Sequence, residues 1–461
     1  MRGERSQSVV ALVALFIFSA LCGKSAGFFS EIVGEHRLDH GGIKKFVKWY
    51  TDKGFRLHEN AVFKREDSRQ GGVNVYVQVV NNTVLAGEEL VVCPYRYLLP
   101  PWLPTRQTAA ERKLLESYFD PREMLSVRLL YEVGLGVKSK WANYLRILPT
   151  PDELKHMPFF WDDAVVDSEK LAGTFLRYEI VESTKRVEML HQKIVGSKIL
   201  PRYTPTLLEV KWAVSIVFSR AFMVQKEVKN TLRLDGMPFL APLADMLNHG
   251  YGSKIGYTLG SNAPKVKRKK QKQKRKFKII GLQTFEPSEE LTINYLSSTE
   301  LTISNQKTYI HYGFCSETIL PTDTIPLDFT IPLDADRGNR RREEVRQATN
   351  TPNSFFIYNK KKRPEKLIDW FLIMQMEESE LEAGAPALAH AKASAYAKEA
   401  ALQAMKTMVL GFKKEVQDAE YVHDSCTDRI IRFEQTIVRY HVSEIDKDLR
   451  ALYEMRGGRE L

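Results

Sequence analysis

The spacing of apolar residues changes character several times along the chain. Apolar residues recur at helical intervals over Ile43 to Tyr50, whereas Val73 to Val80 and Val84 to Cys93 are rich in the valine and tyrosine typical of strands. Residues 110–235 are mainly helical in pattern. Two runs there have apolar residues at i, i+3 and i+4: Leu125 to Tyr131 and Leu207 to Val224.

The second half of the chain returns to strands and ends in helices. Leu240 to Ile319 predicts short strands with tight turns, and Leu327 to Asp334 predicts a strand-like pair. Helical spacing then dominates three segments: Lys366 to Met376, Ala387 to Lys414 and Ile430 to Glu454. Strands and helices do not alternate regularly, so the order favours an α+β fold with a split sheet over an all-parallel α/β fold.

The N-terminus has the composition of a secretory signal peptide. Arg2 and Arg5 precede an apolar stretch from Val9 to Cys22, and small residues follow up to Ala26. This apolar stretch is short for a membrane span, which needs about 20 residues, so no stable span is expected. Residues 1–26 are therefore predicted to direct the chain into the secretory pathway, with an uncleaved anchor as the alternative. Secretion, the endomembrane system and a plastid-type organelle stay open as destinations.

The positive charge of the chain is concentrated in one tract. The formal net charge is +11, and Pro264 to Lys278 alone carries ten Lys or Arg residues and no acid, so the remainder has a net charge of 11 − 10 = +1. A fold that grips nucleic acid would spread such charge over a face. We therefore expect residues 261–278 to form a solvated basic loop, and no specific nucleic-acid partner. Its role is left open.

The cysteines predict neither a disulfide framework nor a metal site. Cys22 lies in the predicted leader, which leaves Cys93, Cys315 and Cys426 as three widely spaced thiols. No CxxC pair or Cys/His cluster with the spacing of zinc ligands is present in the sequence.

Four separated segments carry the chemistry. They are Leu129 to Pro149, Trp212 to Phe222, Ala241 to His249 (APLADMLNH) and Glu290 to Phe314, which contains Ile-Asn-Tyr, Ser-Asn and Tyr-Gly-Phe. In this order they resemble the SET-domain protein methyltransferases of the Rubisco large-subunit methyltransferase type. The specific element is Asp-x-x-Asn-His ahead of Tyr, Ser-Asn and Tyr-Gly-Phe, because a lone Asn-His pair would mean little.

The resemblance implies a domain organisation. A SET-domain β-fold of short sheets with a pseudoknot is expected over 41–319, with a helical insert at about 110–238 and the basic loop 261–278 within it. Residues 320–461 resemble the family's mainly α-helical substrate-binding domain.

The resemblance also implies roles for five side chains. Asn248 and His249 match the pair that contacts the adenosine part of S-adenosylmethionine, and an amide with an imidazole offers a purine both donors and acceptors. Arg220 matches the residue that binds the cofactor's carboxylate, which suits a planar guanidinium. Tyr312 matches the active-site tyrosine, and Tyr295 matches a second tyrosine lining the lysine channel. Such groups would orient a neutral lysine amine toward the methyl group.

Two features depart from the family pattern. The nearest match to the family's cofactor-binding glycine turn is Gly72, within Gln70 to Asn74, where adjacent glycines permit a close backbone approach but the spacing differs. About five residues, Thr299 to Ile303, are inserted before Ser304.

Together these features predict an S-adenosylmethionine-dependent protein-lysine N-methyltransferase that acts, as a monomer, on a non-histone protein. Tyr312 favours lysine, since a histidine-methylating relative lacks this tyrosine. Protein-histidine methylation is the enzymatic alternative, and a SET-fold binding module without turnover is the alternative from another class. The sequence leaves the substrate and the degree of methylation open.

Overall fold

The structure is a computed structural model in two compact units. The described residues are 29, 32–33, 40–67, 73–104, 117–168, 171, 174–200, 203–223, 236–250, 253, 255–260, 276–295, 304–317, 323–328, 337–358, 361, 363–364, 366–411 and 426–455. The first unit comprises Met1–Phe160 with Ser183–Leu301, and the second comprises Trp161–Glu182 with Thr302–Leu461. The predicted leader, Gly72, Thr299 to Ile303 and most of the basic loop lie outside the described residues, so predictions about them stay predictions.

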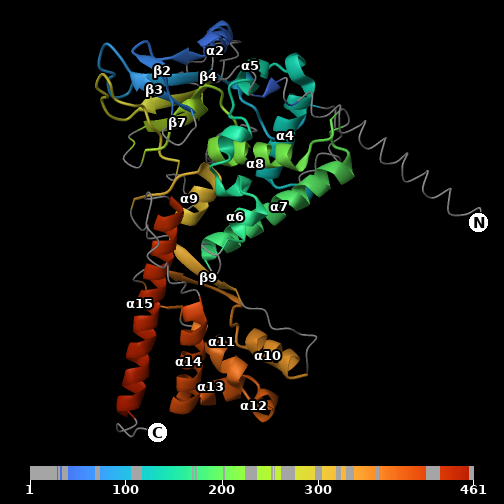
Figure 1. Cartoon of the computed structure of the whole chain (residues 1–461), viewed down its shortest axis with the longest axis vertical. Helices are drawn as coiled ribbons and strands as arrows, with labels where there is room; N and C mark the ends of the chain where they lie inside the picture. The colour runs from blue at the N-terminus through green and yellow to red at the C-terminus, as the bar shows by residue number, and fades with distance from the viewer. Residues whose placement is uncertain are drawn as a thin grey trace, which may run out of the picture. The chain divides into compact units, whose positions relative to one another are not determined.

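A four-stranded antiparallel sheet, a hairpin and one further pair of two-residue strands form the described β part of the first unit (Figure 1). The sheet order is β1-β4-β8-β7, with Val92 of β4 opposite Lys278 of β8. The strands are β1 (Arg56–Leu57), β4 (Glu89–Pro94), β7 (Ile255–Gly260) and β8 (Lys276–Gly281), and the hairpin pairs β2 (Ala61–Asp67) with β3 (Val73–Val79). Helix α2 (His40–Asp52) precedes them. Phe277 is fully buried and its ring lies 5.0 Å from that of Phe222, so the sheet faces an aromatic core.

Two capped helices form the centre of the helical insert. Helix α4 (Pro121–Leu135) begins at Asp120, whose carboxylate accepts from the amides of Arg122 and Glu123. Helix α8 (Leu207–Arg220) begins at Thr206, which forms a reciprocal capping box with Glu209. The short helices around them are α5 (Ala142–Leu145), and the 3-10 turns η2 (Gly136–Lys138), η3 (Asp152–Leu154) and η4 (Pro158–Phe160). These helices agree with the helical character predicted for the insert at about 110–238.

Two predicted element boundaries in the first unit were wrong. Helix α8 ends at Arg220, not Val224, because β5 (Phe222–Met223) pairs with β6 (Pro238–Phe239) and takes the chain out of the helix. The strand predicted from Val84 begins at Glu89, and Val84 forms an isolated bridge to Phe285. Within Leu240 to Ile319, predicted as short strands with tight turns, residues 244–246 form the 3-10 turn η5 (Ala244–Met246).

The second unit is mainly helical, as expected for residues beyond 320, around one two-stranded sheet. Strand β9 (Thr324–Asp328) pairs with β10 (Ser354–Tyr358), whose residues had not been predicted as a strand. The helices are α6 (Asp163–Val166), the start of α7 (Phe175–Ser197), α9 (Asn305–Tyr312), α10 (Arg337–Ala348), α11 (Leu367–Gln375), α12 (Glu378–Ala383), α13 (Ala385–Ala393), α14 (Ala395–Gly411) and α15 (Cys426–Met455). Figure 1 shows α14 and α15 running alongside each other, and apolar residues of both contribute to one buried core.

The second unit also corrects the sequence prediction. Residues 305–312 are helical rather than extended, because Ser304 caps α9 and the left-handed Gly313 ends it. Strand β9 pairs with β10 rather than with a second strand inside Leu327 to Asp334. The predicted helix from Ala387 is divided at Ser394 into α13 and α14.

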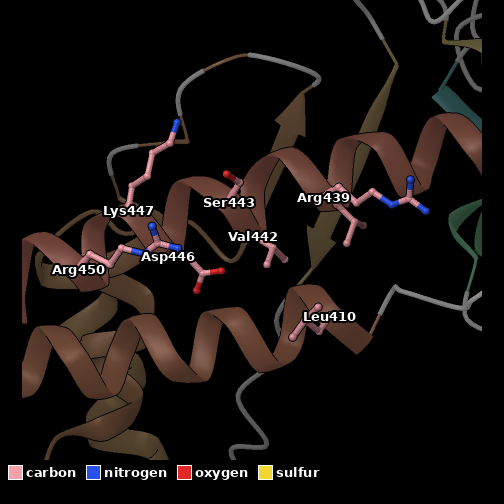
Figure 2. A pocket seen from close by; sticks show the side chains of 8 residues that line it. Leu410, Arg439, Val442, Ser443, Asp446, Lys447 and Arg450 are labelled. Carbon is pink, nitrogen blue, oxygen red and sulfur yellow. The ribbon is translucent and has the colours of Figure 1, made fainter.

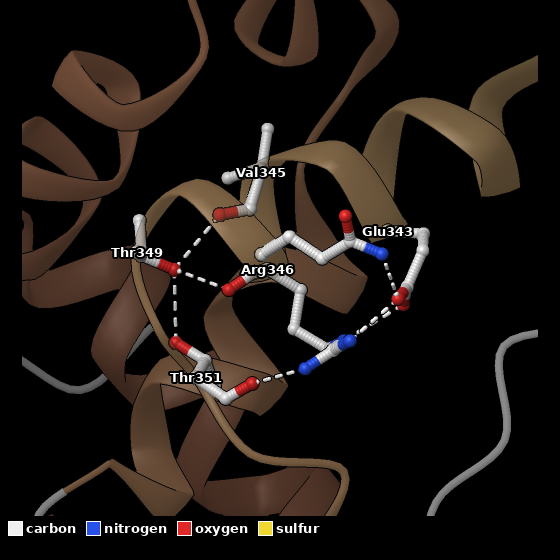
Figure 3. A network of polar contacts seen from close by, with 6 residues as sticks. Glu343, Val345, Arg346, Thr349 and Thr351 are labelled. Carbon is white, nitrogen blue, oxygen red and sulfur yellow. Dashed lines mark hydrogen bonds and ion pairs between the residues drawn. The ribbon is translucent and has the colours of Figure 1, made fainter.

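A polar network stabilises the C-terminal end of α10 and the turn that connects it to β10 (Figure 3). The guanidinium of Arg346 donates to both carboxylate oxygens of Glu343 and to the carbonyl of Thr351. The Thr349 hydroxyl donates to the carbonyl of Val345 over 2.8 Å. Since Thr351 is fully buried, this network satisfies polar groups that have left water at the end of the helix.

One disulfide lies in the second unit and corrects the interpretation of the cysteines. Cys315, just after α9, is bonded to Cys426, the first residue of α15, with their Cα atoms 5.7 Å apart. Cys93 is free and buried in the first unit. Two of the three thiols thus form a single cross-link, which joins segments 111 residues apart in the sequence.

Within the described ranges, no helix combines the length and apolarity needed to cross a membrane. The same residues contain no group of three His, Cys, Asp or Glu side chains placed to hold a metal ion.

Candidate cofactor site

Arg220 is fixed at the C-terminal end of α8. Trp212, in the middle of this helix, is fully buried and donates through Nε1 to the carbonyl of Pro149 over 2.6 Å, which anchors the helix. From the last helical position, Arg220 donates through Nη1 to the main-chain carbonyl of Asp245 over 2.7 Å. Its Nε is buried, and among the described residues this atom has no acceptor. The guanidinium is therefore anchored on one side and keeps a buried donor on another.

The carboxylate of Asp245 is buried beside Arg220. The hydroxyl of Tyr144, from α5, donates a short hydrogen bond to Oδ2 of Asp245. Tyr144 is fully buried and Asp245 is 5% exposed. The other carboxylate oxygen, Oδ1, is buried and has no hydrogen-bond partner within the described part of the chain. One oxygen of Asp245 thus joins the helical insert to the Asp-x-x-Asn-His segment.

The electrostatics of Asp245 reflect this burial. Loss of solvation raises the pKa of Asp245 from 3.8 to about 6, although the charge of Arg220 and the hydrogen bond from Tyr144 act in the opposite direction. Burial, then the charge of Asp245, raises the pKa of the Tyr144 hydroxyl well above its ordinary value. The hydroxyl therefore stays protonated and serves as a donor.

The backbone next to Asp245 is strained. Leu243 has φ of +80° and ψ of −48°, a conformation that a branched side chain rarely adopts. Leu243 is fully buried, and this packing holds the turn in place. The turn directs the following residues into η5 and sets the direction of the chain toward Asn248.

Asn248 and His249 lie against the segment that contains Tyr295. His249 forms a parallel bridge with Ile293, and the amide of Ile293 donates to the carbonyl of Asn248 over 2.8 Å. The side-chain amide of Asn248 donates to Glu290 over 2.9 Å. The amide of Tyr295 donates to Nδ1 of His249 over 3.1 Å. Two segments more than 40 residues apart in the sequence are thereby held in register.

The protonation state of His249 and the orientation of the Tyr295 hydroxyl follow from burial and from one further hydrogen bond. Burial lowers the pKa of His249 to about 4, so the imidazole is neutral at pH 7. Because Nδ1 accepts from the Tyr295 amide, the proton of the neutral ring resides on Nε2. The Tyr295 hydroxyl donates to the carbonyl of Leu247 over 2.6 Å, which fixes the phenol oxygen and leaves its lone pairs as acceptors.

Gly250 allows the two segments to approach this closely. A Cβ atom at Gly250 would lie 2.7 Å from Cβ of Thr292, nearer than real carbon atoms approach. A larger residue would separate the bridge at His249. The sequence analysis had not selected Gly250.

Tyr312 lies in the second unit, as the last residue of α9. Its ring centroid is 5.8 Å from that of Phe314. The start of the same helix is held by Asn305, which donates from its side chain to Asp323 over 2.7 Å and accepts from the amide of Ser316 over 2.7 Å.

A buried carboxylate connects α9 with two other elements of the second unit. Glu434, on α15, accepts from the amides of Phe175 and Leu176 at the start of α7, each over 2.9 Å. It also accepts from the side chain of Gln306 on α9 over 3.2 Å. Burial raises the pKa of Glu434 from 4.5 to about 7 despite these hydrogen bonds.

The predicted site residues are thus distributed over two units. Arg220 and Tyr295 both bond to one stretch of the first unit, residues 245–249, to which Asn248 and His249 belong. Tyr312 belongs to the second unit. The sequence did not single out Asp245 or Tyr144 as site residues. Asp245 is the acid of the Asp-x-x-Asn-His pattern, and Tyr144 lies within the segment Leu129 to Pro149.

Comparison of the whole chain with solved structures decides the fold. The SET domain of LSMT bound to lysine and AdoHcy superimposes with a TM-score of 0.66 over 90% of this chain and 93% of the other, at 18% sequence identity. The structure of Rubisco LSMT bound to AdoMet gives a TM-score of 0.62 over the same shares. The chain has the SET-domain fold. The predicted α+β architecture with its helical C-terminal region is confirmed.

Relatives of this SET-fold chain are found among lysine methyltransferases. Ribosomal lysine N-methyltransferase set10 of Schizosaccharomyces pombe is 21% identical over 332 residues, which is 71% of this chain and 55% of set10. N-lysine methyltransferase SETD6 of Rattus norvegicus is 26% identical over 236 residues, covering 46% of this chain and 45% of SETD6. This chain therefore spans about half the length of these relatives. No protein-family model matches it.

Proposed function

We propose that this chain is an S-adenosylmethionine-dependent protein-lysine N-methyltransferase. The observation that carries the proposal is that Arg220 and Tyr295 both bond to residues 245–249, the stretch that contains Asn248 and His249. The names of the relatives support the same reaction, and the related structures contain AdoMet, AdoHcy and lysine.

Arg220 suits the cofactor's carboxylate. A carboxylate binds a guanidinium best through two parallel N–H donors. Arg220 uses Nη1 on the Asp245 carbonyl, which orients the fork, and its buried Nε is a donor without an acceptor among the described residues. A buried donor of this kind costs free energy unless a ligand satisfies it.

Asn248 and His249 suit the adenosine moiety. The neutral imidazole offers an N–H donor at Nε2, and the Asn248 main chain and side chain are both fixed, to Ile293 and to Glu290. A neutral ring also avoids electrostatic repulsion with the sulfonium charge of the cofactor.

The protein residues would position the amine rather than perform strong acid–base chemistry. The bound cofactor supplies an electrophilic methyl group on sulfur. The incoming lysine must be neutral to attack, and a free lysine has a pKa near 10.4, so a desolvating channel has to lower it. The Tyr295 oxygen, fixed by its bond to Leu247, would accept a hydrogen bond from the amine and direct its lone pair. Tyr312 would take the second such position, as the family resemblance implies.

Calorimetry with S-adenosylmethionine tests the proposal. Wild type is expected to bind with a micromolar Kd, and Arg220→Ala is expected to weaken binding at least tenfold, about 1.4 kcal/mol or more. Arg186→Ala, on the exposed face of α7, is the matched control and should bind normally. Absence of wild-type binding at high micromolar concentration would leave the chain as a SET-fold binding module.

Mass spectrometry of labelled proteins separates lysine from histidine as the acceptor. Radiolabelled methyl transfer into a lysate of the source cell is expected to modify lysine on a non-histone protein. Tyr312→Phe should reduce this labelling strongly. Methylated histidine would replace the proposal with its enzymatic alternative, and equal labelling by Tyr312→Phe would exclude the role given to Tyr312.

We also propose that the protein is directed to the secretory pathway by residues 1–26 and works as a monomer. The Cys315–Cys426 disulfide supports an oxidising compartment, since such bonds are rare in the cytosol. Asn81, in the triplet Asn81-Asn82-Thr83, is exposed after β3 and would be open to glycosylation there. A mobility shift after endoglycosidase treatment, absent in Asn81→Gln, would test targeting, and a cytosolic, unshifted tagged protein would refute it. Gel filtration tests the oligomeric state, and elution at the mass of a dimer would contradict the proposed monomer.

A further inference from the structure

A groove runs between α14 and α15 in the second unit (Figure 2). It has a volume of about 280 Å³ and is open to solvent along its length. Its lining residues are Leu410, Val438, Arg439, Val442, Ser443, Asp446, Lys447 and Arg450. The volume is slightly below the ~300–1,000 Å³ typical of small-molecule pockets, and an open groove of this size suits single side chains of a longer ligand.

The floor of the groove is aliphatic. Leu410 of α14 and Val442 of α15 point toward each other in Figure 2 and are half-buried. Val438 beneath them is 1% exposed and belongs to the core of the second unit. The floor thus offers apolar area that a ligand could cover, and it is backed by the packed core of the second unit.

The rim of the groove is cationic. Arg439 and Arg450 are exposed and have no ion-pair partner among the residues that the structure describes. They lie eleven residues apart, which is about 16 Å along the helix axis. The acid of the lining, Asp446, is neutralised by Lys406 over 2.6 Å. Lys447 is held by Glu444 over 2.7 Å. Two uncompensated guanidinium groups therefore stand at the two ends of an apolar floor.

We infer that this groove docks an acidic amphipathic segment of a partner protein, which presents an aliphatic side chain to Leu410 and Val442 and carboxylates to Arg439 and Arg450. Guanidinium groups bind carboxylates in a planar, bidentate geometry. If the proposed function holds, the segment belongs to the methylation substrate and lies away from the lysine that is modified.

The lining favours a protein over a nucleic acid. A single-stranded nucleic acid needs aromatic side chains for base stacking along a cationic track, and none of the described residues that line the groove is aromatic. An apolar floor between two cations is instead complementary to one face of an amphipathic helix that carries an aliphatic residue between two acidic positions.

Fluorescence anisotropy of a labelled peptide tests this inference. The probe is a short synthetic helical peptide with two glutamate pairs about 16 Å apart and one leucine between them. Wild-type full-length protein is expected to bind it at low salt, and Arg439→Glu/Arg450→Glu is expected to weaken binding at least tenfold. Leu410→Asp should weaken it similarly, since the floor would then repel the leucine and carry a negative charge.

The control double variant is Arg340→Glu/Arg432→Glu, which makes the same change in net charge on exposed positions of α10 and α15 outside the groove. It is expected to keep wild-type affinity. Equal weakening by the control would mean that general charge attraction holds the peptide, and the inference would fail. Failure of wild type to bind would also overturn it, as would tighter binding of single-stranded DNA or anionic vesicles through the same two arginines.

Two further measurements separate neighbouring explanations. S-adenosylmethionine calorimetry on the groove variant should match wild type, so a defect in peptide binding with intact cofactor binding assigns the loss to the groove and not to the proposed reaction. Neutralising Glu415, Asp418 and Glu420 tests the chain's own acidic segment as occupant. If peptide binds only after this change, the groove holds that segment, and a partner protein is excluded as its resting ligand.

Discussion

The two units hold their motif residues by different means. The first unit uses a noncovalent polar network, in which Tyr144 and Arg220 both bond to Asp245, the acid of the Asp-x-x-Asn-His segment. The second unit holds the region of Tyr312 with a disulfide, Cys315–Cys426, and with the carboxylate of Glu434. A region closed by a covalent bond resists separation, whereas a polar network depends on every partner.

The buried carboxylates of the two units differ in a way that reflects their roles. Both have pKa values raised by burial, Asp245 to about 6 and Glu434 to about 7. Both oxygens of Glu434 accept hydrogen bonds, from Phe175, Leu176 and Gln306. Asp245 has one oxygen with a partner and one, Oδ1, without a partner in the described part of the chain. The Glu434 carboxylate is fully satisfied within the second unit, whereas that of Asp245 keeps one buried acceptor that water or a ligand could satisfy.

Reducing the disulfide should have the largest effect. A cross-link that closes a loop of about 100 residues stabilises by about 5 kcal/mol in the chain-entropy description. Hydrogen exchange followed by mass spectrometry should show faster exchange in α9 and α15 after reduction, with α4 and α8 unchanged. Cys315→Ser/Cys426→Ser should reproduce this without reductant. If hydrogen exchange accelerated equally in both units after reduction, the disulfide would not stabilise the second unit selectively.

Loss of the Asp245 carboxylate should have the next largest effect, and in the first unit. Asp245→Ala removes the acceptor of the buried Tyr144 hydroxyl and the buried negative charge beside Arg220, whose hydrogen bond to the main-chain carbonyl remains. The free energy of unfolding should fall by about 3 kcal/mol. Denaturant unfolding monitored on Trp212 provides the measurement. Tyr144→Phe should cost about 2 kcal/mol, and the double variant should cost clearly less than the sum, because the two side chains share one bond. Strict additivity would contradict the network.

The pH dependence of the second unit should follow Glu434. The folded pKa of about 7 lies above the unfolded value of 4.5, so the stabilisation is fully present below pH 4.5 and is lost as pH rises through 7. The change amounts to about 3 kcal/mol at most. Exchange at the start of α7, corrected for intrinsic rates, should accelerate between pH 5 and pH 8. Glu434→Gln should flatten this profile, and Asp448→Asn, exposed on the same helix, should not.

Tyr295→Phe should give the smallest change in stability. It removes one hydrogen bond, to the carbonyl of Leu247, at a cost of about 1 kcal/mol. Methyl transfer should fall by a larger factor than the cofactor's affinity, because the oxygen would act on the amine. A parallel fall in both would make Tyr295 a purely structural residue.

The sequence selected candidate site residues in the first unit but not the contacts that support them. Asn248, His249 and Tyr295 belong to short motifs that resemble the family, so they could be selected as candidates, and their roles stay predictions. Tyr144 and Asp245 lie 101 residues apart, and only the tertiary structure brings them together. Phe222 and Met223 continue the apolar spacing of α8, and pairing with β6, not propensity, takes them out of the helix.

The second unit was predicted less completely for the same reason. Helical spacing located α11 and α14, but Phe175 and Glu434 are 259 residues apart, and no local pattern announces their hydrogen bond. The pairing of Cys315 with Cys426 across 111 residues was equally invisible to spacing arguments. Long-range polar and covalent contacts are the part of this fold that periodicity does not encode.

At Leu243 the strained backbone lowers the stability of the fold, but it also fixes the direction of the chain toward the candidate site. Glycine at this position would relieve the strain of the positive φ but would leave a cavity where the buried leucine packs. A strained turn is an obvious target when a protein is engineered for thermal stability. Relaxing this turn would change the position of Asp245 and of the residues that follow it. Thermostabilised variants of this protein should therefore keep Leu243 if the candidate site is to keep its geometry, and should gain their stability through changes elsewhere.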